Sequence, residues 1–105
     1  MRFVLFFVFS IGFLNGLKAQ FSISGFVYDE KEKQPLPFAE VSVPALNFYS
    51  QSDSIGRFHF DQIPFGEYHL QIRLLGYRTL IAPIHSADSL KVFQFYLSIG
   101  HGEFP

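Results

Sequence analysis

The sequence predicts an all-β protein, built as a sandwich of about seven short strands. Apolar residues alternate with polar ones from position 21 onward. Turn residues separate the alternating runs at regular spacing, and no window of a dozen residues in that region carries a helical stripe. Because alternation gives each strand one apolar face, we expect two sheets to close over a single aromatic core.

Residues 1–19 are predicted to be a signal peptide, helical before its removal. Met1-Arg2 is a short basic start, and the apolar run over 3–14 is too short to span a bilayer, which takes about 20 residues. A polar stretch and Ala19 then fit cleavage before Gln20. An uncleaved anchor and a buried N-terminal helix are the alternatives. The chain has no cysteine to accept the lipid of a bacterial lipoprotein, so we expect a mature protein that is soluble or held at a membrane only by something else.

The composition of the mature chain indicates where its stability comes from and which class of partner is not expected. Ten of the 15 phenylalanines and all five tyrosines remain after cleavage, and such an aromatic load raises the burial per residue. Without cysteine, stability must come from packing alone. Loss of Arg2 and Lys18 leaves six basic against nine acidic residues, a net charge of about −3. An acidic domain without a basic stripe argues against nucleic acid as a partner.

The first strand and the connection after it are predicted from alternation and from prolines. The inward residues of this strand are Phe21, Ile23, Gly25 and Val27. The connection over 29–37 is charged, and Pro35 and Pro37 force extended geometry on the residues before them. The next strand places Ala39, Val41 and Val43 inward, with Glu40 and Ser42 on the opposite face.

Turns and further strands complete the prediction. Asp53 and Gly56 occupy the first and last positions of a type I turn, and Pro64-Phe65-Gly66 forms a second reversal. Gly76 marks a bulge or a strand exit. The later inward residues are Tyr68, Leu70, Ile72 and Leu74, then Phe93, Phe95 and Leu97. We expect the domain to cover 20–98 and the tail over 99–105, which lacks periodicity, to be frayed.

Several segments together resemble one known family, the carboxypeptidase regulatory-like domains. Residues 23–29 and 34–43 resemble its G-x-V-x-D and P-L-P-x-A-x-V-x-V patterns, and 53–60 resembles its D-x-x-G-x-F-x-F hairpin. The match continues through 63–70 and 75–79, so it covers nearly all of the mature chain. The resemblance implies a transthyretin-like or immunoglobulin-like sandwich of about seven strands without catalytic residues.

The same resemblance implies a cellular setting. Such domains are similar to the N-terminal extension of TonB-dependent outer-membrane receptors, particularly those that import glycans. They also occur beside metallocarboxypeptidase domains and in surface proteins. Neither a plug nor a transmembrane barrel follows in this sequence, so transport is not expected of this polypeptide itself. We expect the protein to be exported, to the periplasm or to the outer membrane through indirect association.

The family motifs have a plain structural interpretation. The turn or bulge residues among them are Pro37, Gly56, Gly66 and Gly76, and the aromatics of the core or its edge are Phe58, Phe60, Tyr68 and Tyr77. The motif residues are Gly25, Asp29, Pro35, Pro37, Asp53, Gly56, Phe58, Pro64, Gly66, Tyr68, Gly76 and Tyr77.

Catalytic and metal sites are not expected. His59 and His69 should face outward, and they could be cross-strand neighbours if their strands pair about the turn at 64–66, but zinc needs a third ligand that the pattern lacks. Hydroxyisourate hydrolases of the transthyretin-like fold end in Tyr-Arg-Gly-Ser, whereas Tyr77-Arg78-Thr79-Leu80 lies in mid-chain. No serine lies in a nucleophile elbow. We predict no enzyme activity and no cofactor.

Binding through exposed aromatics remains open. Phe26, Tyr28, Phe48, Tyr49 and Phe65 lie off the inward register or in loops, where they would either stack on a sugar, seat a protein, or close the sandwich ends. An edge strand that pairs with a partner is a further option. The leading hypothesis is a non-catalytic periplasmic module related to the N-terminal domain of TonB-dependent receptors, either a truncated receptor or a short accessory protein. It would contact a protein, either an outer-membrane receptor or an associated component. The alternatives are a secreted glycan- or surface-binding module and, third, a regulatory partner of a separate peptidase.

Overall fold

The computed structural model describes residues 20–100. Within that range the chain forms strands and two short 3₁₀ helices but no α-helix, so the predicted all-β sandwich is confirmed. The strands are β1 (Gln20–Asp29), β2 (Glu40–Val43), β3 (Phe48–Gln51), β4 (Arg57–Pro64), β5 (Glu67–Arg73), β6 (Leu80–His85) and β7 (Val92–Leu97); the 3₁₀ helices are η1 (Pro44–Leu46) and η2 (Ser86–Leu90). None of the helices in this range is both long and apolar enough to cross a membrane. The predicted signal peptide, residues 1–19, lies outside the described residues.

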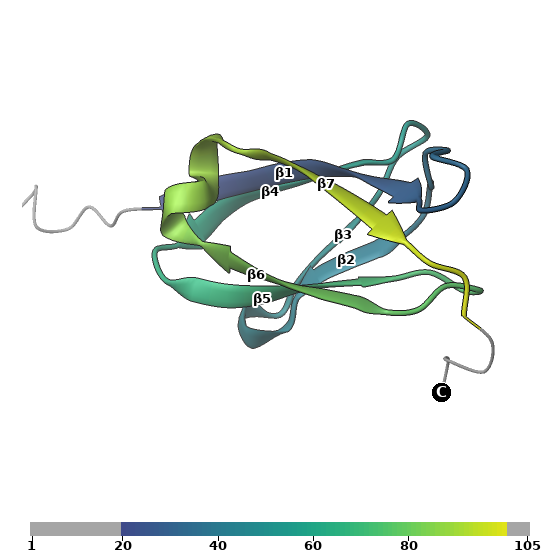
Figure 1. The fold of residues 1–105 in the computed structure, drawn as a ribbon. Coiled ribbons are helices and arrows are strands. Elements are labelled where there is room, and N and C mark those ends of the chain that lie inside the picture. The colour runs from purple at the N-terminus through teal and green to yellow at the C-terminus, as the bar shows by residue number, and fades with distance from the viewer. Residues whose placement is uncertain (1–19, 101–105) are drawn as a thin grey trace, which may run out of the picture.

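The strands form two layers (Figure 1). The first is a three-stranded sheet in the order β4-β1-β7, and the second is a four-stranded sheet in the order β3-β2-β5-β6. β1 is the central strand of its sheet, antiparallel to β4 and parallel to β7. The first and last strands of the domain are therefore direct neighbours, although about 70 residues separate Ser24 from its partner Val92.

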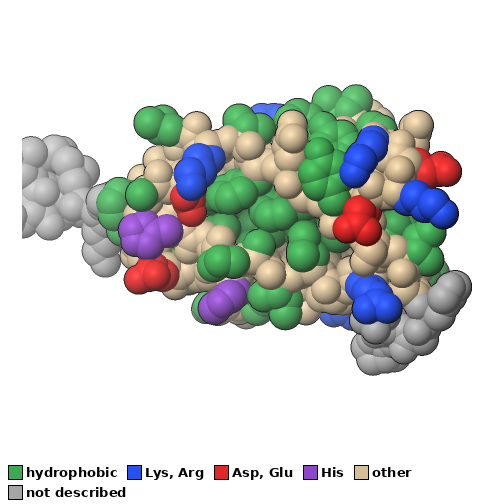
Figure 2. Space-filling model, viewed as in Figure 1, with side chains coloured by type: hydrophobic (Ala, Val, Ile, Leu, Met, Phe, Trp, Pro, Cys, Tyr) green, Lys and Arg blue, Asp and Glu red, His purple; other side chains and the backbone are tan. Residues whose placement is uncertain are grey.

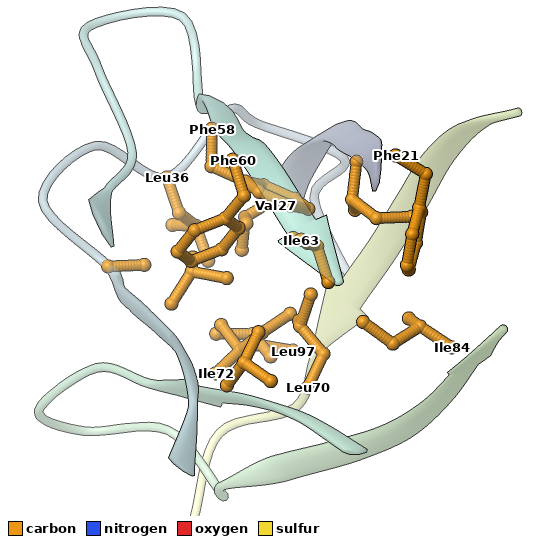
Figure 3. Close-up of a cluster of buried hydrophobic side chains, with 14 residues drawn as sticks. Phe21, Val27, Leu36, Phe58, Phe60, Ile63, Leu70, Ile72, Ile84 and Leu97 are labelled. Carbon is orange, nitrogen blue, oxygen red and sulfur yellow. The ribbon is translucent and has the colours of Figure 1, made fainter. Parts of the chain in front are cut away.

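The core lies between the two sheets, and its residues follow the predicted alternation. Figure 3 shows Phe60 and Ile63 from β4 pointing across to Leu70 and Ile72 from β5. The buried apolar residues are Phe21, Ile23, Val27, Leu36, Ala39, Val41, Val43, Phe58, Phe60, Ile63, Leu70, Ile72, Ile84 and Leu97. Burial of apolar surface at about 25 cal/mol per Å² is the main favourable term in a domain without disulfides.

Two connections differ from the prediction because they cross between the sheets. The turn at 53–56 joins β3 to β4, and the turn at 65–66 joins β4 to β5, yet β3 and β5 belong to one sheet and β4 to the other. The interpretation of 53–60 as a hairpin is therefore wrong. The idea that His59 and His69 are cross-strand neighbours is also wrong. Each imidazole lies on the outer face of its own sheet, because the inward residues beside them fill the core.

The turn at 53–56 itself has the predicted geometry. The Gly56 N–H donates to the Asp53 carbonyl at 2.9 Å, and the Asp53 carboxylate accepts from Ile55 and Arg57 N–H at 3.0 and 2.9 Å. Gly56 has φ of +81°, and a Cβ there would lie 2.6 Å from the Val27 carbonyl oxygen. Glycine is needed at this position both for the left-handed conformation and for the close approach to β1.

Ser42 differs from the predicted alternation, because it is buried although its side chain points away from the core. In the sheet it lies between Tyr49 of β3 and Gln71 of β5, its registered neighbours. The larger side chains on both sides shield the small serine from solvent. Alternation alone could not predict this, since the shielding depends on which strands flank β2.

The end of the domain pairs with the loop after β5. Ile99 forms an isolated bridge with Tyr77, and the Gly100 N–H donates to the Gly76 carbonyl at 3.2 Å. Gly76 lies past the end of β5 in a turn in which the Tyr77 N–H donates to the Leu74 carbonyl at 3.0 Å. Residues 101–105 of the predicted tail lie outside the described residues.

Candidate interaction surface

Asp29 and Tyr77 form a polar latch between two loops. The Tyr77 hydroxyl donates to Asp29 Oδ2 at 2.8 Å, while Asp29 Oδ1 accepts from the Lys31 and Glu32 N–H groups at 2.8 and 2.9 Å. The backbone bond from Glu32, then the Tyr77 hydroxyl, lowers the pKa of Asp29. The bond to Asp29, together with burial, raises the pKa of Tyr77. A carboxylate so well supplied with donors is a weaker base than a free one, which fits a structural role for the pair.

The other motif residues also lie in the core or at turns. Phe58 is buried, and a Cβ on Gly25 would lie 2.7 Å from the Phe93 carbonyl oxygen. Gly66 directly precedes β5, and the Tyr68 hydroxyl donates to the Pro64 carbonyl at 3.0 Å. Pro35 forms a bridge with Tyr28, which folds the connection after β1 back onto that strand.

His59 lies on one sheet, whereas His69 and His85 lie on the other sheet and line one hollow. His59 Nε2 lies 2.8 Å from Asp61 Oδ1 on the outer face of β4, and His85 Nδ1 accepts from the Ala87 N–H at 3.0 Å where it caps η2. Within residues 20–100, no group of three or more histidine, cysteine, aspartate or glutamate side chains is placed to hold a metal ion. His101 is not among the described residues.

An aromatic row lies on the outer face of the three-stranded sheet. It consists of Phe26 and Tyr28 on β1 and Tyr96 on β7. The rings of Phe26 and Tyr28 have centroids 6.2 Å apart and planes 20° apart, and those of Tyr28 and Tyr96 have centroids 5.5 Å apart and planes 27° apart. Lys33 Nζ lies 4.7 Å from the centre of the Tyr96 ring, a cation–π contact.

Sequence reasoning found two members of this row and missed the third. Tyr96 alternates with Phe95 and Leu97, so its outward direction was readable from the pattern. Its position opposite Tyr28 depends on the parallel pairing of β1 with β7. No local pattern indicates which strands become neighbours over that sequence separation.

The other predicted surface aromatics do not join the row. Tyr49 is 63% exposed on β3 in the other sheet, and Phe65 is 58% exposed at the β4–β5 turn. The Phe65 ring meets Phe21 edge-on with a centroid distance of 5.9 Å, so it also closes one end of the sandwich. Phe48 is half-buried and packs against the core.

Phe38 is a second exposed aromatic that the sequence did not single out. It is 68% exposed and has φ of +65°, a conformation that bulky residues rarely adopt. It lines an open hollow with the highly exposed Leu75, beside an ion pair in which Arg73 lies 4.0 Å from Glu40. Exposed ion pairs of this length contribute little to stability.

Comparison with known families gives one match. A family model described as a CarboxypepD_reg-like domain matches residues 23–98. The chain belongs to this family. A comparison with curated proteins found no match. The match runs from Ile23 in β1 through the end of β7, and it confirms the family that the motifs had indicated.

Membership in the CarboxypepD_reg-like family agrees with the structure of the motif residues. The family consists of regulatory, immunoglobulin-like modules, which is compatible with a protein that is not an enzyme. In this CarboxypepD_reg-like domain Gly56, Gly66 and Gly76 lie in turns, Gly25 packs closely against β7, and the motif aromatics lie in the core or pack against it. The aromatic row, by contrast, contributes nothing to the space between the sheets.

Proposed function

We propose that this CarboxypepD_reg-like domain is a non-catalytic interaction module, exported to the periplasm, that contacts a protein at the inner side of the outer membrane. The partner is an outer-membrane receptor of the TonB-dependent class or a component associated with one. The aromatic row is the observation that carries the proposal. Stacked rings on an outer sheet face have no packing role in the core, and aromatic side chains are enriched at protein interfaces.

The surroundings of the row fit a contact surface. Gln94 of β7 and Arg57 of β4 flank Phe26 in the sheet register, and Lys33 adds a positive charge at Tyr96. A stable interface buries about 800 Å² on each partner, more than three rings provide. The partner would therefore also cover the exposed Gln94 and Val92. Aromatic anchors surrounded by polar groups are the usual arrangement of binding hot spots.

The test is site-specific photo-crosslinking in the native cell. The full chain carries a photoreactive phenylalanine analogue at Tyr96, or at Tyr49 on the other sheet as the matched control. We expect a crosslink from position 96 to an outer-membrane protein and none from position 49. Fractionation of the same cells should find the processed protein in the periplasmic or outer-membrane fraction. A protein retained in the cytoplasm, or equal crosslinks from both positions, would contradict the proposal.

Glycan binding is the second candidate, and the aromatic row on an outer sheet face supports it. Such a row offers apolar surface against which the C–H groups of sugar rings can pack. The test is binding of the purified mature domain to a glycan array, followed by affinity measurement for Tyr96→Ala and Tyr28→Ala. Each variant should lose about tenfold in affinity if one ring contributes roughly 1.4 kcal/mol. Tyr49→Ala should bind like the wild type, and equal losses in all three variants would overturn this candidate.

A further inference from the structure

The two sheets have four edge strands, and three of them carry features that discourage further pairing. β3 has only four residues, and β6 contains Pro83, which lacks an N–H. β4 has a register shift opposite Phe21 and Ile23, and Gln62 in that segment has φ of +59°. Short length, proline and bulges are the devices by which proteins protect sheet edges. β7 has none of them between Val92 and Leu97, and the loop after β5 pairs with residues 98–100, just past its end.

β7 is a regular, uncharged edge strand of six residues, Val92–Leu97. It follows η2 and lies along the border of its layer, on the side that faces the viewer in Figure 1. Figure 2 shows hydrophobic side chains gathered across the middle of this side of the molecule, between the places that β7 and β6 take in Figure 1. Phe93 and Phe95 point into the sandwich yet remain half-exposed, because no described strand lies beyond β7.

The direction of the free backbone groups on β7 follows from two hydrogen bonds. The Leu97 carbonyl accepts from Glu30 just past β1, whereas the Ser98 carbonyl accepts from Arg78 on the opposite side. Successive residues of a strand direct their N–H and C=O groups to opposite edges. Val92, Gln94 and Tyr96 therefore present their backbone groups to the outer edge of β7, away from β1.

We propose that the outer edge of β7 pairs with β7 of a second copy of this chain, antiparallel and centred on Gln94. In this register Gln94 of one copy lies opposite Gln94 of the other, and Val92 lies opposite Tyr96. Every outward backbone group of the strand finds a partner, and the two-fold symmetry closes the assembly as a dimer. The two three-stranded sheets become one continuous sheet.

A second copy fits this edge for two reasons. No charged residue occurs between Val92 and Leu97, so self-pairing brings no like charges together across the strands. In this register the inward residues of one strand lie opposite the inward residues of the other. Phe93 and Phe95 of both copies therefore face the same side of the sheet and cover each other's exposed surface. The outer faces stay accessible, and the two aromatic rows come to lie on one surface. This inference does not depend on the proposed function.

The test uses the position on the symmetry axis. Gln94→Lys and Gln94→Glu each place like charges opposite themselves, whereas a mixture of the two variants places opposite charges together. Gln51→Lys is the matched control, because Gln51 is an exposed glutamine on the edge strand β3. Sedimentation of the mature chain up to about 100 μM is the measurement, since a strand-edge contact smaller than about 600 Å² per partner belongs to the weak class.

The wild type and Gln51→Lys should dimerise alike. Each Gln94 variant alone should associate at least about tenfold more weakly, and an equimolar mixture should recover the dimer. Circular dichroism of every variant reports whether the fold is retained, and the conservative variant Gln94→Asn should leave association near the wild-type level. The proposal would be overturned if the wild type were monomeric at the highest concentration, or if the Gln94→Lys and Gln94→Glu variants dimerised as strongly as the wild type.

Discussion

At the scale of single residues, the polar latch shows how one carboxylate can organise two loops. Asp29 is only 7% exposed, and its carboxylate accepts hydrogen bonds from three donors, two backbone N–H groups and the Tyr77 hydroxyl. Buried carboxylates are tolerated when hydrogen bonds replace the lost water. The sequence placed both residues among the family motifs, but 48 positions separate them, and their contact is visible only in the folded chain.

The latch predicts a pH dependence of stability. The pKa of Asp29 is lower in the folded chain than its ordinary value, so its stabilising contribution is complete above pH about 4 and is lost as the pH falls through the folded pKa. The pKa of Tyr77 is raised, so its contribution is present below pH about 10 and is lost as the pH rises further.

Tyr77→Phe tests both limbs. The variant keeps the ring but removes the hydroxyl donor, so we expect a lower urea midpoint at pH 7. Its stability should also fall less steeply than that of the wild type below pH about 4 and above pH about 10. Tyr49→Phe on the exposed face is the control and should follow the wild type. Identical acid and alkaline limbs in Tyr77→Phe and wild type would show that the latch has no energetic role.

At the scale of elements, buried contacts hold the connections in place. Ser52 is 2% exposed just past β3; its hydroxyl donates to the Leu36 carbonyl at 2.7 Å and accepts from the Ala39 N–H at 2.8 Å. This serine fastens the connection before β2 onto β3. The residues around Ser52 are mostly polar, and their pattern gives no sign of its burial.

Ser52→Ala should destabilise the domain by about 1–3 kcal/mol, because it leaves a buried N–H and a buried carbonyl without their partner. Chemical denaturation compared with Ser54→Ala, an exposed serine in the next turn, is the measurement. A change within about 0.5 kcal/mol, the usual range for surface substitutions, would mean that water or backbone movement replaces the hydroxyl.

At Gly25 the neighbouring strand β7 decides which residue fits, just as neighbouring segments decide the burial of Ser52. A Cβ there would lie 2.7 Å from the Phe93 carbonyl oxygen and 3.0 Å from Phe58 Cε2. The backbone of β7 cannot move away from this Cβ without weakening its pairing with β1. Gly25→Ala should therefore cost about 1–3 kcal/mol in the free energy of unfolding, whereas Gly76→Ala, with no atom within 4 Å of the new Cβ, meets only the strain of its φ of +92°. Equal losses would show that crowding at Gly25 is relieved.

At the scale of the whole molecule, the single core predicts cooperative unfolding. Both sheets contribute to one cluster of buried side chains, and two connections cross between the sheets. Leu70→Ala, in the centre of that cluster, should cost about 2–5 kcal/mol. Far-ultraviolet circular dichroism and tyrosine fluorescence should report coincident transitions for the wild type. Two separated transitions would indicate that the sheets unfold independently.

The sequence by itself determined the strand content, the inward face of most strands, the turn at 53–56 and the family, because these depend on neighbours along the chain. It also gave the outward direction of Phe26 and Tyr28. Only the tertiary structure decided that the turns at 53–56 and 65–66 cross between sheets, that Ser42 is shielded, and that Tyr96 lies against Tyr28. These features depend on which strands pair over long sequence separations, and strand pairing is set by the packing of the whole core rather than by any local pattern.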